Sequence, residues 1–253
     1  MKRKSYTLIS SLLLVVLAIA TLAIKSNVPE LIKQPPATTQ STQRSSQSSQ
    51  NNVNFDEEKY PDFYRIEGKA NIEKNLKPGE IIYTKFDEKG RTLGVYANLT
   101  NTNFKYGKRE RENINDIKPS GWMKNKEVTL HLLDGTTYHG WFYNRSHLLA
   151  HSLGGDDKNY NMITGTRPQN VGKNNGGGGM QYTEMQAYRY LETHRDGQIY
   201  YSAVPNYTGG ELVPRTVTVN IRSNDGSIDQ CVTVYNVAPG YAIDYATGDF
   251  NAN

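Results

Sequence analysis

Three pairs of short β-type segments, each pair joined by a polar turn, limit what this chain can fold into. The pairs are residues 81–86 with 92–97, residues 127–133 with 137–143, and residues 216–222 with a segment around Cys231. Turn residues such as Asp134-Gly135 between alternating segments favour hairpins, and hairpins build antiparallel sheets. We therefore predict an α+β domain with a mostly antiparallel central sheet and few helices.

The N-terminal segment predicts export. Basic Lys2-Arg3-Lys4 precedes an almost continuous apolar stretch at residues 8–24, with small residues near its end. This order is typical of a signal peptide, so we expect residues 1–25 to be removed and the protein to be secreted. The stretch is also close to the shortest that spans a bilayer. An uncleaved membrane anchor, with the rest of the chain on the extracellular face, is therefore the alternative.

The composition then divides the remaining chain in two. Residues 26–52 are rich in Pro, Ser, Thr and Gln. Such a segment cannot bury enough apolar surface to offset the entropy of ordering it, so we predict a disordered polar linker. Residues 53–253 number about 200, a length that suits one folded domain.

The overall charge does not indicate a nucleic-acid-binding protein. The chain has 29 Lys+Arg and 25 Asp+Glu, but four of the basic residues and none of the acidic ones lie in the leader, so the mature charges balance. Affinity for phosphate must then come from a local cluster. The best candidate lies between the first two hairpins, and its basic residues are Lys105, Lys108, Arg109, Arg111, Lys118, Lys124 and Lys126. We expect Arg109 and Arg111 to contact phosphates, with a solvated surface as the alternative.

The stretch Asn144-Arg145-Ser146-His147 carries the strongest chemical signal. It follows the aromatic run Trp141-Phe142-Tyr143, which is typical of a strand end, and places an imidazole two residues from a guanidinium. The two groups together suit attack on a phosphate, because the cation neutralises charge while the imidazole takes a proton. Taken alone, these four residues also fit a surface turn whose histidine only packs or forms hydrogen bonds.

One helix is predicted over residues 180–193. Its apolar stripe contains Met180, Glu184, Ala187, Tyr188 and Leu191. Glu184 is the only charged member of the stripe, so a carboxylate points to where the helix should pack. It lies either at the exposed edge of the stripe or at a functional site.

Further motifs follow His147 in a fixed order: Asn161-Met162-Ile163-Thr164-Gly165-Thr166, Arg167-Pro168-Gln169-Asn170, the glycine run at residues 176–179, and Glu184. In this ordered set the sequence resembles the DNA/RNA non-specific endonucleases of the ββα-metal superfamily, and within them the streptococcal secreted DNases and DNA-entry nucleases. The resemblance implies a ββα-metal active-site motif. Asn144 and Ser146 stand where the broader family has Asp and Gly, which suggests the streptococcal variant.

The resemblance also implies roles for single residues. His147 takes the place of the histidine in the family's Asp-Arg-Gly-His motif and is the expected general base, while Arg145 is expected to bind the scissile phosphate. Asn170 resembles the direct protein ligand of magnesium. Glu184 resembles the helical glutamate that holds a water of that ion, and so counts among the catalytic residues. The expected substrate-binding residues are Arg145, Asn161, Arg167, Arg109 and Arg111.

The implied enzyme is an exported, Mg²⁺-dependent endonuclease that hydrolyses DNA, and also RNA, to 5′-phosphorylated products; Mn²⁺ is expected to substitute. A neutral amide oxygen is a weak ligand for a hard cation, so the ion would keep most of its waters. Contacts to phosphate and sugar rather than base edges would make cleavage sequence-independent. No obligate protein partner is implied, and membrane contact only if the leader is uncleaved.

Two other functions stay open. His147 and His151 have HxxxH spacing, which on a helix presents two imidazoles to zinc. Leu148, however, stands where a zinc hydrolase would have its glutamate. The other alternative is a catalytically inactive nucleic-acid-binding module, against which the presence of the histidine, asparagine and glutamate argues. The glycine run lacks the Gly-Lys-Ser/Thr ending of a nucleotide-binding loop, so we expect a flexible loop beside the site.

Overall fold

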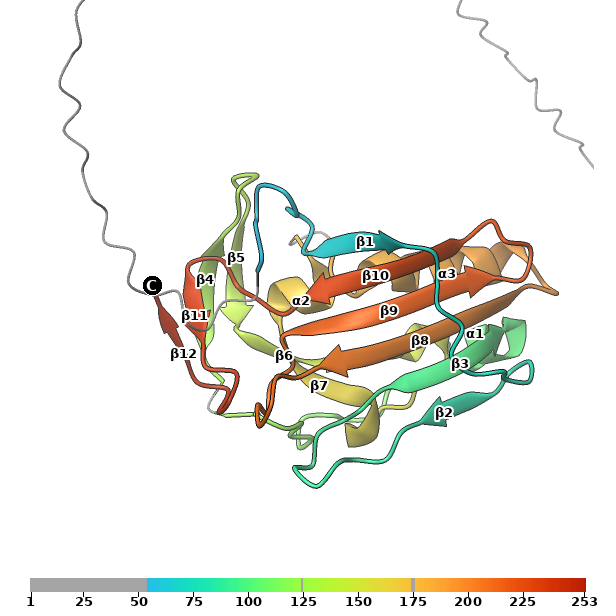
Figure 1. Cartoon of the computed structure of the whole chain (residues 1–253), viewed down its shortest axis with the longest axis horizontal. Coiled ribbons are helices and arrows are strands. Elements are labelled where there is room, and N and C mark those ends of the chain that lie inside the picture. The colour runs from blue at the N-terminus through green and yellow to red at the C-terminus, as the bar shows by residue number, and fades with distance from the viewer. Residues whose placement is uncertain (1–53, 124, 174–175) are drawn as a thin grey trace, which may run out of the picture. The chain divides into compact units, whose positions relative to one another are not determined.

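The computed structural model describes residues 54–253, with the exception of residues 124, 174 and 175 (Figure 1). The leader predicted at residues 1–25 and the linker predicted at residues 26–52 therefore lie outside the described residues. Across the part of the chain that is described, no helix has both the length and the apolar character needed to cross a membrane.

A six-stranded sheet forms the centre of the domain, with strand order β1-β10-β9-β8-β3-β2 and antiparallel neighbours throughout. The strands are β1 (Tyr64–Gly68), β2 (Ile81–Tyr83), β3 (Val95–Thr100), β8 (Gln198–Asn206), β9 (Thr216–Ser223) and β10 (Asp229–Tyr235). Pairing of β2 with β3 and of β9 with β10 confirms two of the predicted hairpins. The predicted α+β class, with a mostly antiparallel sheet, is also confirmed.

The alternation along β9 decides which face of the sheet is the core face. Val217, Val219 and Ile221 are fully buried, whereas Thr216 and Thr218 on the opposite face are only partly buried. Helices α1 (Asn101–Tyr106) and α3 (Gln181–Thr193) cover the core face, behind the sheet in Figure 1. Helix α3 therefore confirms the helix predicted over residues 180–193, and its apolar stripe packs into the main core.

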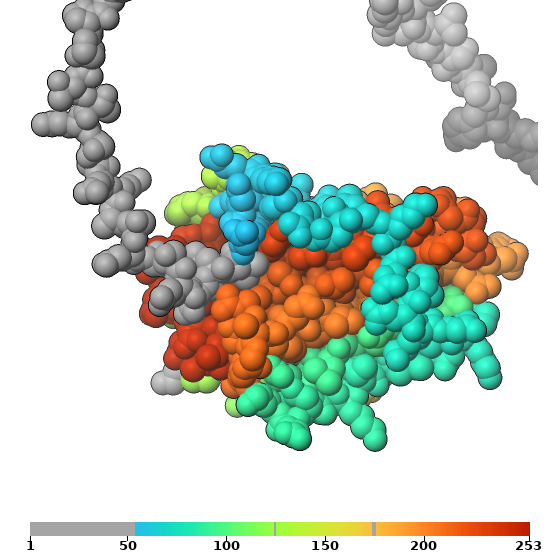
Figure 2. Space-filling model, in the orientation of Figure 1, coloured from blue at the N-terminus to red at the C-terminus, as the bar shows by residue number. Residues whose placement is uncertain are grey.

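The opposite face of the sheet is crossed by a strap, residues 69–78, which runs without regular structure from β1 to β2 (Figures 1 and 2). Side chains of the sheet take up polar groups of the strap backbone. The backbone N–H groups of Ala70, Asn71 and Glu73 donate to the side chains of Asp229, Asn220 and Tyr200, respectively. The side-chain amide of Asn98 donates to the carbonyl of Leu76. The polar outer face of the sheet is therefore matched to the strap.

A second, smaller core lies beside the main sheet. It joins the hairpin of β4 (Glu127–His131) and β5 (Thr137–Trp141) to that of β11 (Tyr241–Ile243) and β12 (Phe250–Ala252). Phe142 is fully buried there and stacks on Phe250 at 3.7 Å between ring centroids. The β4–β5 pair confirms the third predicted hairpin.

A compact ββα unit carries the motifs that were singled out in the sequence. Strand β6 (Tyr143–His147) pairs with β7 (Met162–Thr166), and α2 (Arg167–Val171) follows β7 directly. The short 3₁₀ turns η1 (His151–Leu153) and η2 (Asn159–Asn161) lie in the connection between the strands. Asn144-Arg145-Ser146-His147 therefore forms a strand of its own rather than a turn, and the break that the sequence suggested falls at Phe142.

Candidate active site

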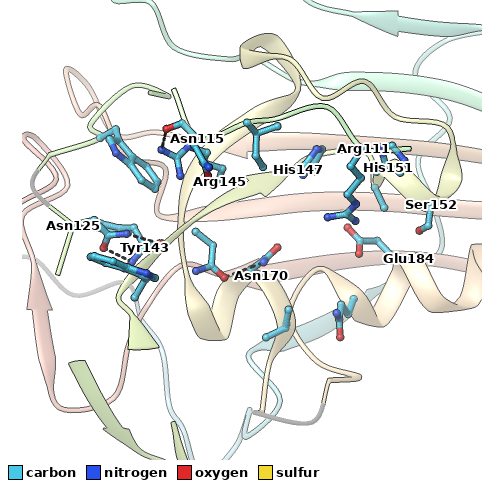
Figure 3. Close-up of a pocket in the computed structure, with 17 residues that line it drawn as sticks. Arg111, Asn115, Asn125, Tyr143, Arg145, His147, His151, Ser152, Asn170 and Glu184 are labelled. Carbon is cyan, nitrogen blue, oxygen red and sulfur yellow. Dashed lines mark hydrogen bonds between the residues drawn. The ribbon is translucent and has the colours of Figure 1, made fainter. Parts of the chain in front are cut away.

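A cleft of about 770 Å³ opens beside the ββα unit (Figure 3). His147 from the end of β6, Asn170 from α2 and Glu184 from α3 all line it. These are the residues that the sequence singled out as base, metal ligand and helical carboxylate. The fold thus brings three residues from three separate elements into one cavity, although 37 positions separate the first from the last.

The His147 ring is held in one orientation. Its Nε2 lies 2.9 Å from Oδ1 of Asp157, and its side chain is 11% exposed. Because a carboxylate only accepts hydrogen bonds, Nε2 must carry the proton, and Nδ1 is the free basic nitrogen of the neutral ring. Burial lowers the pKa of His147 below its ordinary value of 6.5, against the opposing charge of Asp157. Near neutral pH the ring is therefore in the form that can accept a proton.

Asp157 is the functional residue that the sequence motifs did not reveal. Its carboxylate is 1% exposed and accepts three hydrogen bonds, from His147, from Nδ1 of His151 at 2.8 Å and from the amide of Glu112 at 3.0 Å. Burial favours protonation, but these bonds outweigh it and hold the pKa of Asp157 below its ordinary range. An acidic residue between the histidine and the next strand was the only available signal in the sequence.

The two histidines of the HxxxH spacing do not present a shared face to a metal. His147 ends a strand and His151 begins the 3₁₀ turn η1, and both rings bond Asp157 instead. The other nitrogen of His151 bonds the carbonyl of Arg109 at 3.0 Å. Among the described residues, no group of three or more His, Cys, Asp or Glu is placed to hold a metal ion. The HxxxH zinc hydrolase is therefore not supported by the geometry.

Asn170 is fixed by the two residues at which the sequence departs from the Asp-Arg-Gly-His pattern. Its Oδ1 accepts a hydrogen bond from Ser146 at 3.2 Å, and its Nδ2 donates to Oδ1 of Asn144 at 3.1 Å. A flip of the Asn170 amide would bring its oxygen against Oδ1 of Asn144, and two acceptors cannot bond each other, so the oxygen and nitrogen keep their places. Since a carbonyl oxygen has two lone pairs, Oδ1 keeps one for a further partner.

Glu184 and Arg111 face each other across the cleft. Figure 3 shows the guanidinium of Arg111 and the carboxylate of Glu184 pointing toward one another. Burial raises the pKa of Glu184 to about 8, and the charge of Arg111 only partly opposes this. Such a carboxyl group gains from a further cation nearby, because Arg111 balances the charge of its ionised form only in part.

Arg145 lines the same cleft, but two of its five N–H donors are engaged by backbone carbonyls. Its Nε donates to the carbonyl of Ile117 at 2.6 Å, and Nη2 donates to the carbonyl of Asn115. The guanidinium also lies 4.3 Å from the ring of Trp122. Only the remaining N–H groups are free for a phosphate, so Arg145 also anchors residues 115–117 to the wall of the cleft.

Three predicted substrate-binding residues do not line the cleft. Asn161 is fully buried, and its amide bonds both backbone groups of Leu149 and the carbonyl of Asp156. Arg109 donates to the carbonyl of Gly155 at 2.7 Å and stacks on Tyr106. Arg167 lies over the ring of Tyr138 in the β4–β5 hairpin. The structure thus places all three in the framework around the cleft.

The glycine run brings the helices of Asn170 and Glu184 close together. A Cβ on Gly172, Gly178 or Gly179 would overlap the backbone of Gly178, Asp62 or Gln169. The amide of Met180 then bonds the carbonyl of Gln169 at 2.8 Å, so the start of α3 is tied to α2. The expected flexible loop is therefore, at residues 178–179, a tightly packed connection.

Comparison with known proteins identifies the family to which the chain belongs. Residues 64–249 match the DNA/RNA non-specific endonuclease family, and the chain belongs to that family. The resemblance seen in the sequence is thereby confirmed. Within the family, the chain is 32% identical over 229 residues to a deoxyribonuclease of Streptococcus dysgalactiae subsp. equisimilis, with 77% of this chain and 69% of the relative covered.

Solved structures agree with this assignment. The Sda1 nuclease, solved with a bound zinc ion, superposes with a TM-score of 0.74 at 31% identity, over 79% of this chain and all of that chain. NucA from Streptococcus agalactiae with a magnesium ion gives a TM-score of 0.57 at 23% identity, over 73% of this chain and 83% of that chain. The second likeness supports the fold.

Proposed function

We propose that the protein is an exported, Mg²⁺-dependent endonuclease that hydrolyses the phosphodiester bonds of DNA, and also of RNA, to 5′-phosphorylated products. The observation that carries the proposal is a neutral histidine, fixed by a buried carboxylate, in the wall of a cleft that also holds Asn170 and Glu184. Membership in a nuclease family supports the same reaction.

In this proposal His147 is the general base. Its Nδ1 removes a proton from the attacking water, and the positive charge that develops on the ring is stabilised by Asp157, which bonds Nε2. Arg111 and the free N–H groups of Arg145 supply positive charge toward the phosphate as negative charge builds on its oxygens. Nothing in this step requires contact with base edges, so cleavage is sequence-independent.

The donor groups in the cleft suit a hard cation. Asn170 offers an amide oxygen with a spare lone pair, and Glu184 is a carboxyl group that a nearby cation would ionise. We propose that Asn170 holds Mg²⁺ directly and that Glu184 holds it through water; Mn²⁺ is expected to substitute. When bound, the ion supplies positive charge to the phosphate and to the leaving oxygen. The zinc- and magnesium-bound relatives support a divalent ion here.

The decisive measurement is the initial rate of plasmid cleavage against magnesium concentration, with a chelator as the zero point. His147→Ala should lose at least about 10²–10⁴-fold in rate at every magnesium concentration, because the base is gone and the ion site remains. Asn170→Ala should also be slow, but its rate should rise as magnesium is raised. Glu184→Ala should behave like Asn170→Ala with a smaller defect, because it acts through water.

A matched control is His139→Ala, since His139 lies exposed on β5 and does not line the cleft. It should cleave like the wild type. Recovery of His147→Ala by magnesium, or wild-type activity in Asn170→Ala, would overturn the assignments. If the wild type cleaves no plasmid at any magnesium concentration, the alternative of an inactive nucleic-acid-binding module is favoured.

Export is proposed from the basic and apolar leader. The N-terminus of protein from culture supernatant should begin between about residues 21 and 26, where a signal peptide of this length ends. Intact protein found only in washed membranes would establish the uncleaved anchor, with the nuclease on the extracellular face.

A further inference from the structure

The cleft is longer than its catalytic centre. In Figure 3, Asn125, Tyr143 and Arg145 lie on one side of Asn170, and Arg111, Ser152 and Glu184 lie on the other. The chain has two tryptophans, Trp122 and Trp141, and both line this same cleft. Trp122 contacts Arg145 and Tyr143, which lie at the end of the cleft away from Glu184. Trp141 lines the same cleft and precedes Phe142-Tyr143 in the chain, so its backbone lies at that end as well.

Trp141 is unusually exposed for a large aromatic side chain. It is the last residue of β5, it is 53% exposed, and it belongs to neither hydrophobic core. Tryptophan is enriched where its apolar ring can meet a ligand or partner from water. A ring left open to solvent in the wall of a polar cleft therefore indicates a contact made with a ligand.

Trp122 differs, because it is held in place. Its ring is partly buried against the second core, and the Arg145 guanidinium lies 4.3 Å from the ring centroid. Arg145 is itself fixed by the backbone carbonyls of Asn115 and Ile117. The cation and the ring are thus ordered before any ligand arrives, which reduces the entropy lost on binding.

The charge of the domain leaves room for an uncharged contribution to binding. Basic and acidic residues balance once the leader is removed, and two of the basic residues expected to bind phosphate, Arg109 and Arg167, lie outside the cleft lining. Stacking of a base on an aromatic side chain improves affinity by about 5- to 150-fold and tolerates any base, because every base has a π face. Such a contact preserves sequence independence.

We propose that Trp122 and Trp141 form a nucleobase-stacking subsite that takes an unstacked base of a single strand, near the phosphate that is cut. The location of that phosphate rests on the proposed function; the stacking itself does not. A base inside a stiff duplex cannot reach the rings without leaving its stack. The enzyme should therefore bind single strands and frayed ends more tightly than intact duplex, without preferring a base.

The two tryptophans supply a direct binding signal, since the intrinsic tryptophan fluorescence of the chain comes from them alone. In the presence of a chelator, a single-stranded 12-nucleotide DNA should quench this fluorescence. An oligonucleotide of the same length built of abasic sites has the same phosphates and should quench little. Equal quenching by both would overturn the subsite, whether or not the enzyme cleaves DNA.

Cleavage with magnesium then maps the subsite. In single strands with one abasic site at successive positions, the wild type should show a rise in KM of about 5-fold or more at one or two positions. Trp141→Ala should raise KM for the intact strand by a similar factor and no longer respond to those positions. Trp141→Phe, which keeps a ring, should lie between the two.

The control is Leu133→Ala, because Leu133 is also exposed on the β4–β5 hairpin, at 59%, but does not line the cleft. It should match the wild type on every strand. If Trp141→Ala keeps the positional response of the wild type, the subsite is refuted while the proposed hydrolysis stands. If the wild type quenches selectively but cleaves nothing, the hydrolysis fails and the subsite stands.

Discussion

Two neighbouring regions of the domain use the same residue types in opposite ways. We call the first the cleft wall; it consists of Arg111, His147, Asn170 and Glu184. The second, the backing layer, consists of Arg109, Asp157 and Asn161 together with His151, which also lines the cleft but has partners on both ring nitrogens. Each region contains an arginine, a histidine, an asparagine and an acidic residue. In the backing layer the polar groups are bonded to backbone or to each other, whereas groups of the wall keep capacity for a ligand.

The two asparagines show what separates the regions. Asn161 is fully buried and uses both ends of its amide on the backbone around residues 149 and 156. Asn170 uses its amide on two side chains of β6 and keeps one lone pair toward the cleft. Residue type alone therefore does not identify a functional residue; the number of its partners does. Asp157 connects the regions, because it bonds a histidine of each.

Among the three tests of this comparison, the largest effect on cleavage should come from cutting that connection. In Asp157→Asn the shape is kept but the charge that raises the pKa of His147 is lost, so the rate should fall about 100-fold. His147 works as a base only when neutral, so activity is lost as the pH falls through its pKa. Without Asp157 that pKa is lower still, and the acidic limb of the rate profile should move to lower pH.

The measurement is the rate against pH, between about 4.5 and 8, at saturating magnesium. Asp156→Asn is the matched control, because the Asp156 carboxylate bonds Tyr160 rather than a histidine. It should leave both the rate and the profile unchanged. An Asp157→Asn profile that is merely lower, with its acidic limb in the wild-type position, would reduce Asp157 to a structural residue.

Substitutions of the two arginines, Arg111 in the cleft wall and Arg109 in the backing layer, should have effects of intermediate size that differ in kind. Arg111→Ala should lower kcat/KM for long DNA about 10-fold and make its salt dependence shallower by about one phosphate contact, with stability unchanged. Arg109→Ala should instead cost about 1–2 kcal/mol of unfolding free energy, because the carbonyl of Gly155 loses its donor. Rates at several salt concentrations and urea unfolding measure both. Equal salt slopes in the wild type and Arg111→Ala would show that Arg111 does not contact a phosphate.

The smallest effect on rate should follow a change deep in the backing layer. Asn161→Ala leaves both backbone groups of Leu149 and the carbonyl of Asp156 short of a partner, so unfolding should become easier by about 1–3 kcal/mol. The rate per folded molecule should stay within about 2-fold of the wild type. Full stability combined with a large loss of rate would instead return Asn161 to the substrate-binding residues.

Local patterns in the sequence were sufficient for much of the fold. Period-two alternation with turn residues predicted all three hairpins, and the stripe through Glu184 predicted α3. Of the two positions that the stripe left open for the Glu184 carboxylate, the structure has the one in the cleft. Strand β8 was not predicted, because Ala203 and Pro205 weaken its local preference, and its place between β3 and β9 is set by long-range pairing.

Residues of the site were predictable only where a residue of a sequence motif also lies in the cleft. His147, Asn170 and Glu184 follow one another in a recognisable order, and the structure places all three in the cleft. Asp157 belongs to no motif, and its role arises from contacts to residues 112, 147 and 151 that only the fold creates. Asn161 and Arg109 have suitable side chains, but burial and backbone partners decide their position, and no local pattern reports these.

The tightly packed glycines between α2 and α3 also affect the unfolded chain. Gly176–Gly179 is a run of four residues with the largest backbone freedom to lose on folding, each costing about 0.5–1 kcal/mol more than alanine would. Replacing glycine by alanine often stabilises a protein for that reason, but at Gly178 and Gly179 the added methyl group would strike backbone. The domain thus gives up conformational entropy to let two backbones touch, and the helices of Asn170 and Glu184 meet at a distance that no side chain could permit.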